Sequence, residues 1–161
     1  MRLVVAAVGR MKRGPERDLA ERYRDIAAKS GRAIAISGVS IIEVAESRNR
    51  RAWERMSEEA TRLAAEIPEK SIRVALDARG ENLTSEVFAT RMRLWRDAGR
   101  PAAVFLFGGP DGLAADLIGR ADMRLGFGPA TWPHQLVRIM LLEQLYRAIA
   151  ILSGHPYHRG A

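Results

Sequence analysis

The stretch Ala102-Ala-Val-Phe-Leu-Phe-Gly-Gly-Pro-Asp-Gly-Leu113 runs from six apolar residues directly into a glycine-rich turn. The apolar half predicts a buried strand that ends at Phe107. Glycines at the carboxyl end of a strand allow backbone amides to approach a ligand closely, and parallel sheets bind their ligands at that edge. Gly-Pro-Asp-Gly is also an ordinary turn sequence, so the stretch alone is compatible with a binding loop or a simple turn.

Outward from this stretch, short β-rich runs alternate with longer runs of helical periodicity. The predicted strands span residues 2–8, 33–44, 72–76, 102–107 and 123–127, and the predicted helices span 15–30, 47–66, 85–99, 113–121 and 133–153. Asp77, Gly80 and Asn82 are expected in a loop after the third strand. The alternation predicts an α/β fold, a parallel sheet with helices on both faces, in one domain over residues 1–161.

Composition and motifs exclude several classes of protein. The chain has 161 residues, of which 47% are hydrophobic, and it has no cysteine, which excludes disulfides, zinc fingers and a thiol nucleophile. The spacings typical of dinucleotide and nucleoside-triphosphate binding are missing. No apolar run reaches the ~20 residues that cross a bilayer, and the first residues have no signal-peptide pattern. We therefore expect a cytoplasmic protein that does not bind membranes.

The net charge of +7 comes almost entirely from arginine, since only Lys12, Lys29 and Lys70 among the 26 basic residues are lysine. The planar guanidinium suits phosphate better than a lysine amine does. Two clusters are candidates for RNA binding: Arg10, Lys12 and Arg13, and Arg48, Arg50 and Arg51. An arginine-rich genome with solvated helix faces would give the same composition, and charge alone does not distinguish nucleic acid from acidic membranes.

The predicted final helix is apolar around most of its circumference. A surface helix needs only one apolar stripe, so this helix has to be covered on most sides. In a chain of this size a second copy of the protein would provide that cover, which favours a homodimer. A central helix inside a monomer is the alternative.

All three histidines lie near the C-terminus, at His134, His155 and His158. No nearby carboxylate or cysteine completes a metal site with the last two, so no metal is expected. The tail residues Tyr157, His158 and Arg159 combine a ring that can stack on a base, a proton acceptor and a phosphate ligand. The tail is therefore a candidate catalytic segment.

Taken together, five segments resemble the ribosomal RNA large-subunit methyltransferase H family. They are Leu3–Gly9, Phe107–Leu113, Thr131-Trp-Pro-His-Gln-Leu-Val-Arg138, Glu143-Gln-Leu-Tyr-Arg147 and His155-Pro-Tyr-His-Arg159. The resemblance covers the whole chain. It implies a SPOUT-class enzyme that methylates N3 of a pseudouridine in bacterial 23S rRNA, with a C-terminal trefoil knot, an exception to the rule that chains are unknotted.

The resemblance also implies that a homodimer binds S-adenosylmethionine in a bent shape within the knot. The cofactor residues carried over by position are Leu76, Gly108, Phe127, Gly128, Pro129, Ala130, Thr131 and Trp132. Leu76 and Trp132 would supply apolar walls, and the backbone around Gly108 would supply polar contacts. The family commonly has Ser-x-Met-Thr where this chain has Gly128-Pro-Ala-Thr131. If the backbone does the binding, this departure changes little.

An imide nitrogen is a poor nucleophile while protonated, so the implied reaction needs a base or a group that stabilises the anion. We predict His158 as the base, Arg159 as the anion stabiliser and Tyr157 as a stacking or donor group. His134 and Arg138 are second candidates, with capping and ion pairing as the alternative roles.

The expected substrate is the assembled 70S ribosome, with the basic clusters of one subunit docking while the pocket of the other acts. Two alternatives remain: a ribosome-binding factor that has lost methyl transfer, and a SPOUT enzyme that acts on transfer RNA.

Overall fold

The computed structural model describes residues 1–157 and contains a five-stranded sheet in the order β2-β1-β4-β3-β5. The strands are β1 (Arg2–Val8), β2 (Gly38–Val44), β3 (Ile72–Asn82), β4 (Ala102–Phe107) and β5 (Met123–Gly126). The helices are α1 (Pro15–Gly31), the short 3-10 helix η1 (Arg32–Ile34), α2 (Ala52–Ala65), α3 (Ser85–Asp97), α4 (Ala115–Gly119) and α5 (His134–Ser153). Every strand pair is parallel, which confirms the predicted fold class.

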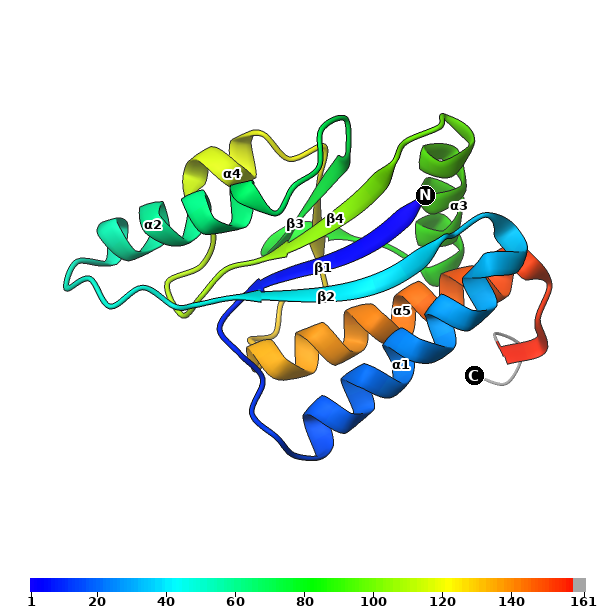
Figure 1. Ribbon diagram of the computed structural model, residues 1–161, viewed down its shortest axis with the longest axis horizontal. Helices are drawn as coiled ribbons and strands as arrows, with labels where there is room; N and C mark the ends of the chain where they lie inside the picture. Colours follow the sequence, from blue (N-terminus) through cyan, green and yellow to red (C-terminus); the bar gives the residue numbers. More distant parts are fainter. Residues whose placement is uncertain (158–161) are drawn as a thin grey trace.

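Helices cover both faces of this sheet, with α1, α3 and α5 on one side and α2 and α4 on the other (Figure 1). Successive side chains of a strand point to opposite faces, and β1 divides its residues accordingly. Leu3 and Val5 pack in the larger cluster with α5, whereas Val4 and Ala6 pack in the smaller cluster with α2 and α4. Both faces of β1 are thus apolar because both are covered.

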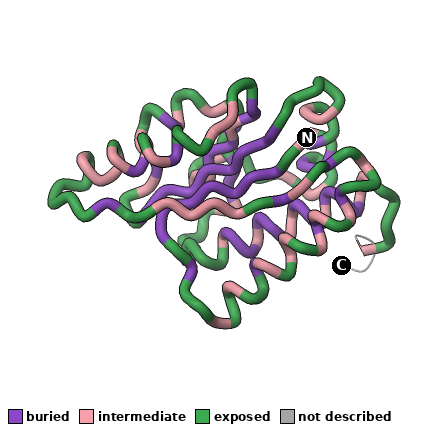
Figure 2. The backbone as a smooth tube through the Cα atoms, viewed as in Figure 1, coloured by how far each residue is buried: buried purple, intermediate pink, exposed green. Residues whose placement is uncertain are grey.

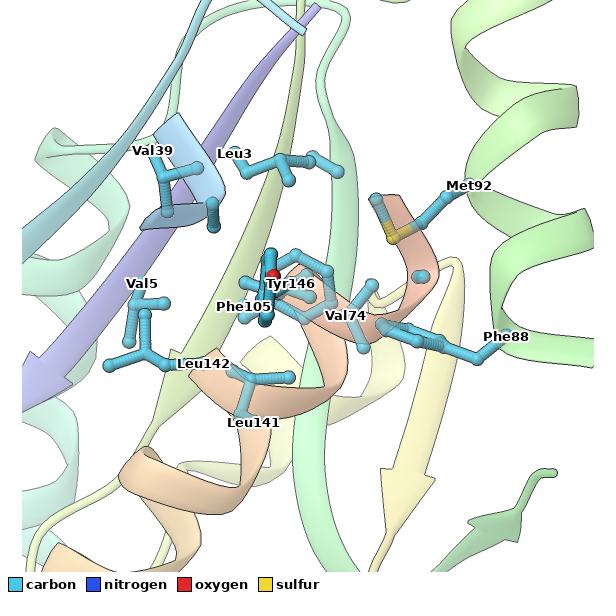
Figure 3. Close-up of a cluster of buried hydrophobic side chains, with 14 of the residues drawn as sticks. Leu3, Val5, Val39, Val74, Phe88, Met92, Phe105, Leu141, Leu142 and Tyr146 are labelled. Carbon is cyan, nitrogen blue, oxygen red and sulfur yellow. The ribbon is translucent and has the colours of Figure 1, made fainter. Parts of the chain in front are cut away.

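The larger cluster lies between the middle of the sheet and α5 (Figure 3). Phe105 of β4 is fully buried and meets Phe88 of α3 edge to face, with ring centroids 6.0 Å apart. Leu141 and Leu142 of α5 are fully buried beside them. This cluster fixes α5 against the sheet, and α5 begins next to the carboxyl ends of the strands.

Helix α5 is covered mainly within one chain, by the sheet, α1 and α3 (Figure 2). These elements cover much of the apolar surface of α5, which the sequence analysis expected a second copy to cover. Leu136 remains 40% exposed, and Met140 faces an open cleft described below. The homodimer therefore stays a prediction that rests on the remaining exposed face of α5.

Strand β3 extends further than predicted, because the residues expected in a loop form part of it. Leu76 pairs with Leu125 of β5, residues 77–80 then leave the ladder, and Glu81 pairs with Leu125 again. A Cβ at Gly80 would lie 2.7 Å from the carbonyl carbon of Leu125, so only glycine allows this close approach. The chain 77–82 thus passes close around β5. The trefoil knot itself stays a prediction.

Two further boundaries differ from the sequence prediction. The β-rich stretch 33–44 is a strand only from Gly38, because its first residues form η1. The helix predicted from residue 47 begins at Ala52, because side chains of α2 bind the backbone of residues 45–50 and hold it outside the helix. Within residues 1–157, no helix is long and apolar enough to cross a membrane.

Candidate active site

The irregular middle of β3 and the loops that follow β4 and β5 meet around a cavity of about 190 Å³, which we call the strand-end pocket. Of the predicted cofactor residues, all except the exposed Pro129 line it: Leu76, Gly108, Phe127, Gly128, Ala130, Thr131 and Trp132. Because these residues come from β3 and from the loops after β4 and β5, the parallel sheet is what brings them together. Their role in cofactor binding remains a prediction.

The loop after β4, residues 108–112, is called the glycine loop. Its turn is closed by the Gly112 amide, which donates to the Gly109 carbonyl oxygen at 2.9 Å. A Cβ at Gly108 would lie 2.5 Å from the Gly112 carbonyl oxygen and 2.5 Å from the Leu113 nitrogen. The backbone of residues 112–113 therefore packs directly against Gly108, and no other residue fits there without moving the loop.

The loop after β5 is held by two side-chain hydrogen bonds. The Gly128 amide donates to Asn82 Oδ1 at 2.6 Å, and Trp132 Nε1 donates to the Phe127 carbonyl oxygen at 3.1 Å. The indole of Trp132 is thereby fixed on the pocket wall while 43% of the residue stays exposed. These bonds shape the segment in which the chain departs from the common Ser-x-Met-Thr pattern.

Sequence reasoning missed several lining residues: Asp77, Ala78, Phe107, Gly112, Leu113, Leu125, Gly126 and Val137. Asp77 is the most informative, because its side chain is only 11% exposed. One oxygen, Oδ1, accepts a hydrogen bond from the Arg79 amide at 2.9 Å, whereas Oδ2 is buried and has no hydrogen-bond partner among residues 1–157. An acidic residue directly after a buried strand was the available signal.

The two second-choice catalytic residues have different surroundings. His134 lines the strand-end pocket and also a smaller adjoining cavity of about 120 Å³ that includes Arg10, Glu46 and Arg138. Arg138 is 4% exposed and donates to the carbonyl oxygens of Val8 at 2.5 Å and Gly9 at 3.0 Å. This geometry matches the alternative, structural role for Arg138.

Burial lowers the pKa of the Arg138 guanidinium, while the carboxylates of Glu43 and Glu46 raise it. Glu43 Oε1 lies 3.2 Å from Arg138 Nη1 and also accepts from the Met11 amide at 2.7 Å. The pair therefore ties the start of α5 to the end of β1.

Tyr157 lies against the second half of α5. Its hydroxyl donates to Glu143 Oε1 at 3.1 Å, its ring centroid lies 4.4 Å from that of Tyr146, and the Arg147 guanidinium lies 4.9 Å from the ring centroid. From His134 to Arg147 an α-helix rises roughly 20 Å, so Tyr157 is remote from the strand-end pocket of its own chain. His158 and Arg159 lie outside the described residues.

The pKa of Tyr157 is raised, first by burial and then by its neighbours Tyr23 and Glu143. The hydroxyl is thus held in its protonated, hydrogen-bond-donating form, and the chemistry of Tyr157 is that of a donor rather than a base.

Both basic clusters lie at the same edge of the sheet as the strand-end pocket. Arg10, Lys12 and Arg13 are exposed in the loop after β1, and Arg48, Arg50 and Arg51 are exposed after β2. The two strands are neighbours, and the Gly9 amide donates to the Val44 carbonyl oxygen at 2.9 Å where they end. The clusters are therefore placed side by side, and RNA binding by them stays a prediction.

A larger cavity, about 560 Å³, lies between α1, the start of α3 and α5 and is called the helical cleft. Leu19 and Tyr23 of α1 face Met140 and Glu143 of α5 across it. Among residues 1–157, no group of three or more His, Cys, Asp or Glu side chains is placed to hold a metal ion.

A parallel α/β sheet with a backbone-lined pocket at its carboxyl edge places the protein in the class of open α/β proteins, whose ligands bind beyond the strand ends. The model of the predicted SPOUT methyltransferase family matches residues 1–158. The chain belongs to this family and is a methyltransferase.

Curated relatives named ribosomal RNA large subunit methyltransferase H are similar over nearly the whole chain. The relative from Afipia carboxidovorans is 56% identical over 99% of both chains, and the one from Bradyrhizobium diazoefficiens is 55% identical over the same shares. A solved probable methylase family protein from Haemophilus influenzae is 10% identical, with a TM-score of 0.49 over 97% of this chain and 69% of its own.

Proposed function

We propose that the protein transfers a methyl group from S-adenosylmethionine to N3 of a pseudouridine in 23S rRNA. The single observation that carries the proposal is the strand-end pocket, lined by seven of the eight predicted cofactor residues in a chain more than half identical to named ribosomal RNA large subunit methyltransferases. The nucleotide and the atom follow from the family resemblance. Because ribosomes are its substrate, the protein acts in the cytoplasm.

The residues of the strand-end pocket fit S-adenosylmethionine. Leu76 and Trp132 supply apolar walls for adenine, and the glycine loop offers backbone where a side chain would not fit. Asp77 Oδ2 has no partner among the described residues and suits a ligand that carries positive charge and hydroxyl groups. When bound, the cofactor supplies an electrophilic methyl group on a positively charged sulfur.

The chain itself has to orient the base and handle its proton. His134, on the pocket wall, and His158 are the candidate proton acceptors, and Arg159 stabilises negative charge on the base. Tyr157 stays protonated because its pKa is raised, so it acts as a hydrogen-bond donor or stacking group. Arg138 is a positioning residue, since two of its nitrogens already bind the end of β1.

A homodimer is the working form in this proposal. Tyr157 is remote from the strand-end pocket of its own chain, so a tail that serves this pocket has to come from a second copy. The helical cleft and the exposed Leu136 supply an apolar surface for that copy. The basic clusters of one protomer then dock on the assembled 70S ribosome while the pocket of the other acts.

The first test is transfer of a labelled methyl group from S-adenosylmethionine to 70S ribosomes, free large subunits and bulk tRNA from cells that lack this activity. Label mainly in 23S rRNA of assembled ribosomes is the expected result. Label in tRNA would favour the tRNA alternative. No label in any acceptor from a folded protein would favour the non-catalytic binding factor.

The catalytic assignment is tested in the same assay with Tyr157→Phe, His158→Ala, Arg159→Ala and His134→Ala. Near-normal rates in all three tail variants would exclude the tail. Double charge reversals in the two basic clusters are expected to weaken ribosome binding, with less dependence on salt than the unchanged protein shows.

A further inference from the structure

Two neighbouring turns of α2 contact both the loop that precedes this helix and the glycine loop. Residues 45–51, called the basic loop, contain Arg48, Arg50 and Arg51 and connect β2 to α2. The glycine loop belongs to the strand-end pocket through Gly108 and Gly112. One face of α2 therefore stands between a candidate RNA-docking segment and a candidate cofactor segment.

Arg55 makes four hydrogen bonds that join these loops. Its Nε and Nη2 donate to the Asp111 carboxylate at 2.7 and 3.0 Å. Its Nη1 donates to the carbonyl oxygens of Asn49 at 3.0 Å and Arg50 at 2.9 Å. The two ends of one planar group thus hold the glycine loop and the basic loop, a geometry that a lysine amine cannot reproduce.

The contact with Asp111 is important because the glycine loop has the sequence Gly-Gly-Pro-Asp-Gly. Asp111 is its single side chain able to form a hydrogen bond. The Arg55 guanidinium also holds the pKa of the Asp111 carboxyl below its ordinary value, so the ion pair persists to lower pH than an unpaired carboxylate would stay charged.

Glu59, one turn further along α2, contacts the same two loops independently. It is 3% exposed, and its Oε1 accepts a hydrogen bond from the Ser47 amide of the basic loop at 2.9 Å. On its other side, a Cβ at Gly109 would lie 2.8 Å from Glu59 Oε2. The glycine loop therefore packs directly on this carboxylate, and a shift of either loop has to displace α2 or the other loop.

We propose that Arg55 is a positioning residue that links RNA docking on the basic loop to cofactor binding at the glycine loop. The inference rests on the proposed function, since it takes the strand-end pocket as the cofactor site and the basic loop as a docking site. Arg55 does not line the strand-end pocket. It holds both loops in one arrangement, so a ligand that orders one loop favours the other ligand, and the effect is reciprocal.

The experiment measures two affinities in the full-length protein. Calorimetry gives the dissociation constant of S-adenosylmethionine, and sedimentation gives that of unmethylated 70S ribosomes with and without S-adenosylhomocysteine as a non-reacting cofactor. Asp111→Asn removes the charge and one of the two oxygens that Arg55 binds but leaves Arg55 on the basic loop, whereas Arg55→Gln removes the guanidinium from both loops. Arg55→Lys keeps the positive charge but loses the planar guanidinium that binds both loops.

In the unchanged protein, the cofactor is expected to tighten ribosome binding about fivefold, at the low end of usual coupling. The ratio of the ribosome dissociation constants without and with cofactor is called the coupling factor. In Asp111→Asn the dissociation constant of S-adenosylmethionine rises about fivefold, the coupling factor falls toward one, and ribosome affinity without cofactor is unchanged. Arg55→Gln weakens both ligands. Arg55→Lys restores ribosome affinity but not the effect of the cofactor on that affinity. A residue with only a structural role would not separate these two results.

Arg96→Gln is the matched control, because Arg96 also bridges a carboxylate, Asp97, and a backbone carbonyl, that of Ile34, far from the strand-end pocket. It should leave both affinities unchanged, and thermal unfolding identifies any variant that has lost its fold. A coupling factor of one in the unchanged protein, or unaltered affinities in Asp111→Asn and Arg55→Gln, overturns this inference alone. Failure of the unchanged protein to bind S-adenosylmethionine overturns the proposed function as well.

Discussion

The strand-end pocket and the helical cleft differ in how they are built. The pocket is the smaller, about 190 Å³ against about 560 Å³, and its wall comes from β3 and the loops after β4 and β5. The cleft is lined mainly by side chains of α1, α3 and α5. The cleft has the larger volume, but a wall of folded backbone with one carboxylate oxygen, Asp77 Oδ2, that is unpartnered among residues 1–157 is the more specific chemical environment.

The two regions therefore depend on different kinds of residue. The pocket depends on glycines at which no Cβ fits, such as Gly80 and Gly108. The cleft shares residues 125–128 with the pocket, but its other wall consists of helical side chains such as Leu19 and Met140. Substitutions in the pocket should therefore abolish ligand binding, whereas substitutions in the cleft should change association between copies.

The largest effect is expected for Gly108→Ala. The added methyl would meet the Gly112 carbonyl oxygen and the Leu113 nitrogen, both at 2.5 Å, so the backbone of the glycine loop has to move. We expect the dissociation constant of S-adenosylmethionine, measured by calorimetry, to rise at least about 100-fold, equivalent to roughly 3 kcal/mol. Gly119→Ala is the control, because nothing lies within 4 Å of a Cβ there. Equal affinities in the two variants would show that the loop is not a binding element.

A smaller effect, on assembly rather than on cofactor affinity, is expected for Leu19→Glu. If the helical cleft receives a second copy, this change places an unpaired carboxylate in an apolar interface, which costs roughly 2 kcal/mol or about 30-fold in the dimer dissociation constant. Analytical ultracentrifugation measures it. Leu94→Glu is the matched control, since Leu94 is 56% exposed on α3 and does not line the cleft. A dimer as tight as the unchanged protein would place the interface elsewhere.

The contrast also explains how far the sequence could predict the molecule. The strands 2–8 and 102–107 were predicted to the residue, because buried parallel strands are continuous apolar runs bounded by glycine or proline. The extension of β3 was missed, because its cause is the approach of Gly80 to β5, a contact between distant segments. The bond from Asp111 to Arg55 was missed for the same reason.

Site residues divide in the same way. Leu76 and Gly108 were found by resemblance, and the structure brings both to one pocket. Asp77 has no feature in the sequence beyond its place after a strand, so its buried, unpartnered oxygen becomes visible only in three dimensions. Arg138 was a second catalytic candidate in sequence, with ion pairing as the alternative, and its bonds to Val8 and Gly9 become visible only in three dimensions.

The smallest effect is expected for Tyr157→Phe, whose hydroxyl binds Glu143 of the helical cleft. The change removes the hydrogen bond from the hydroxyl to Glu143, which contributes about 1 kcal/mol to the free energy of unfolding near pH 7. The effect also depends on pH, since burial raises the pKa of Tyr157 above its ordinary value of 10.0. Below pH 10 both folded and unfolded states keep the proton, and the contribution is complete.

Above pH 10 the unfolded chain releases this proton while the folded chain retains it, so stability is lost as pH rises toward the folded pKa. Urea unfolding at pH 7 and at pH 10.5 measures this loss, and Tyr157→Phe should show a smaller loss between the two because phenylalanine has no proton to release. Glu143→Gln is the companion variant, since it removes the acceptor but keeps the ionisable hydroxyl. An equal alkaline loss in Tyr157→Phe and the unchanged protein would mean that the tail tyrosine is not held on α5, and that the tail is free to reach the strand-end pocket.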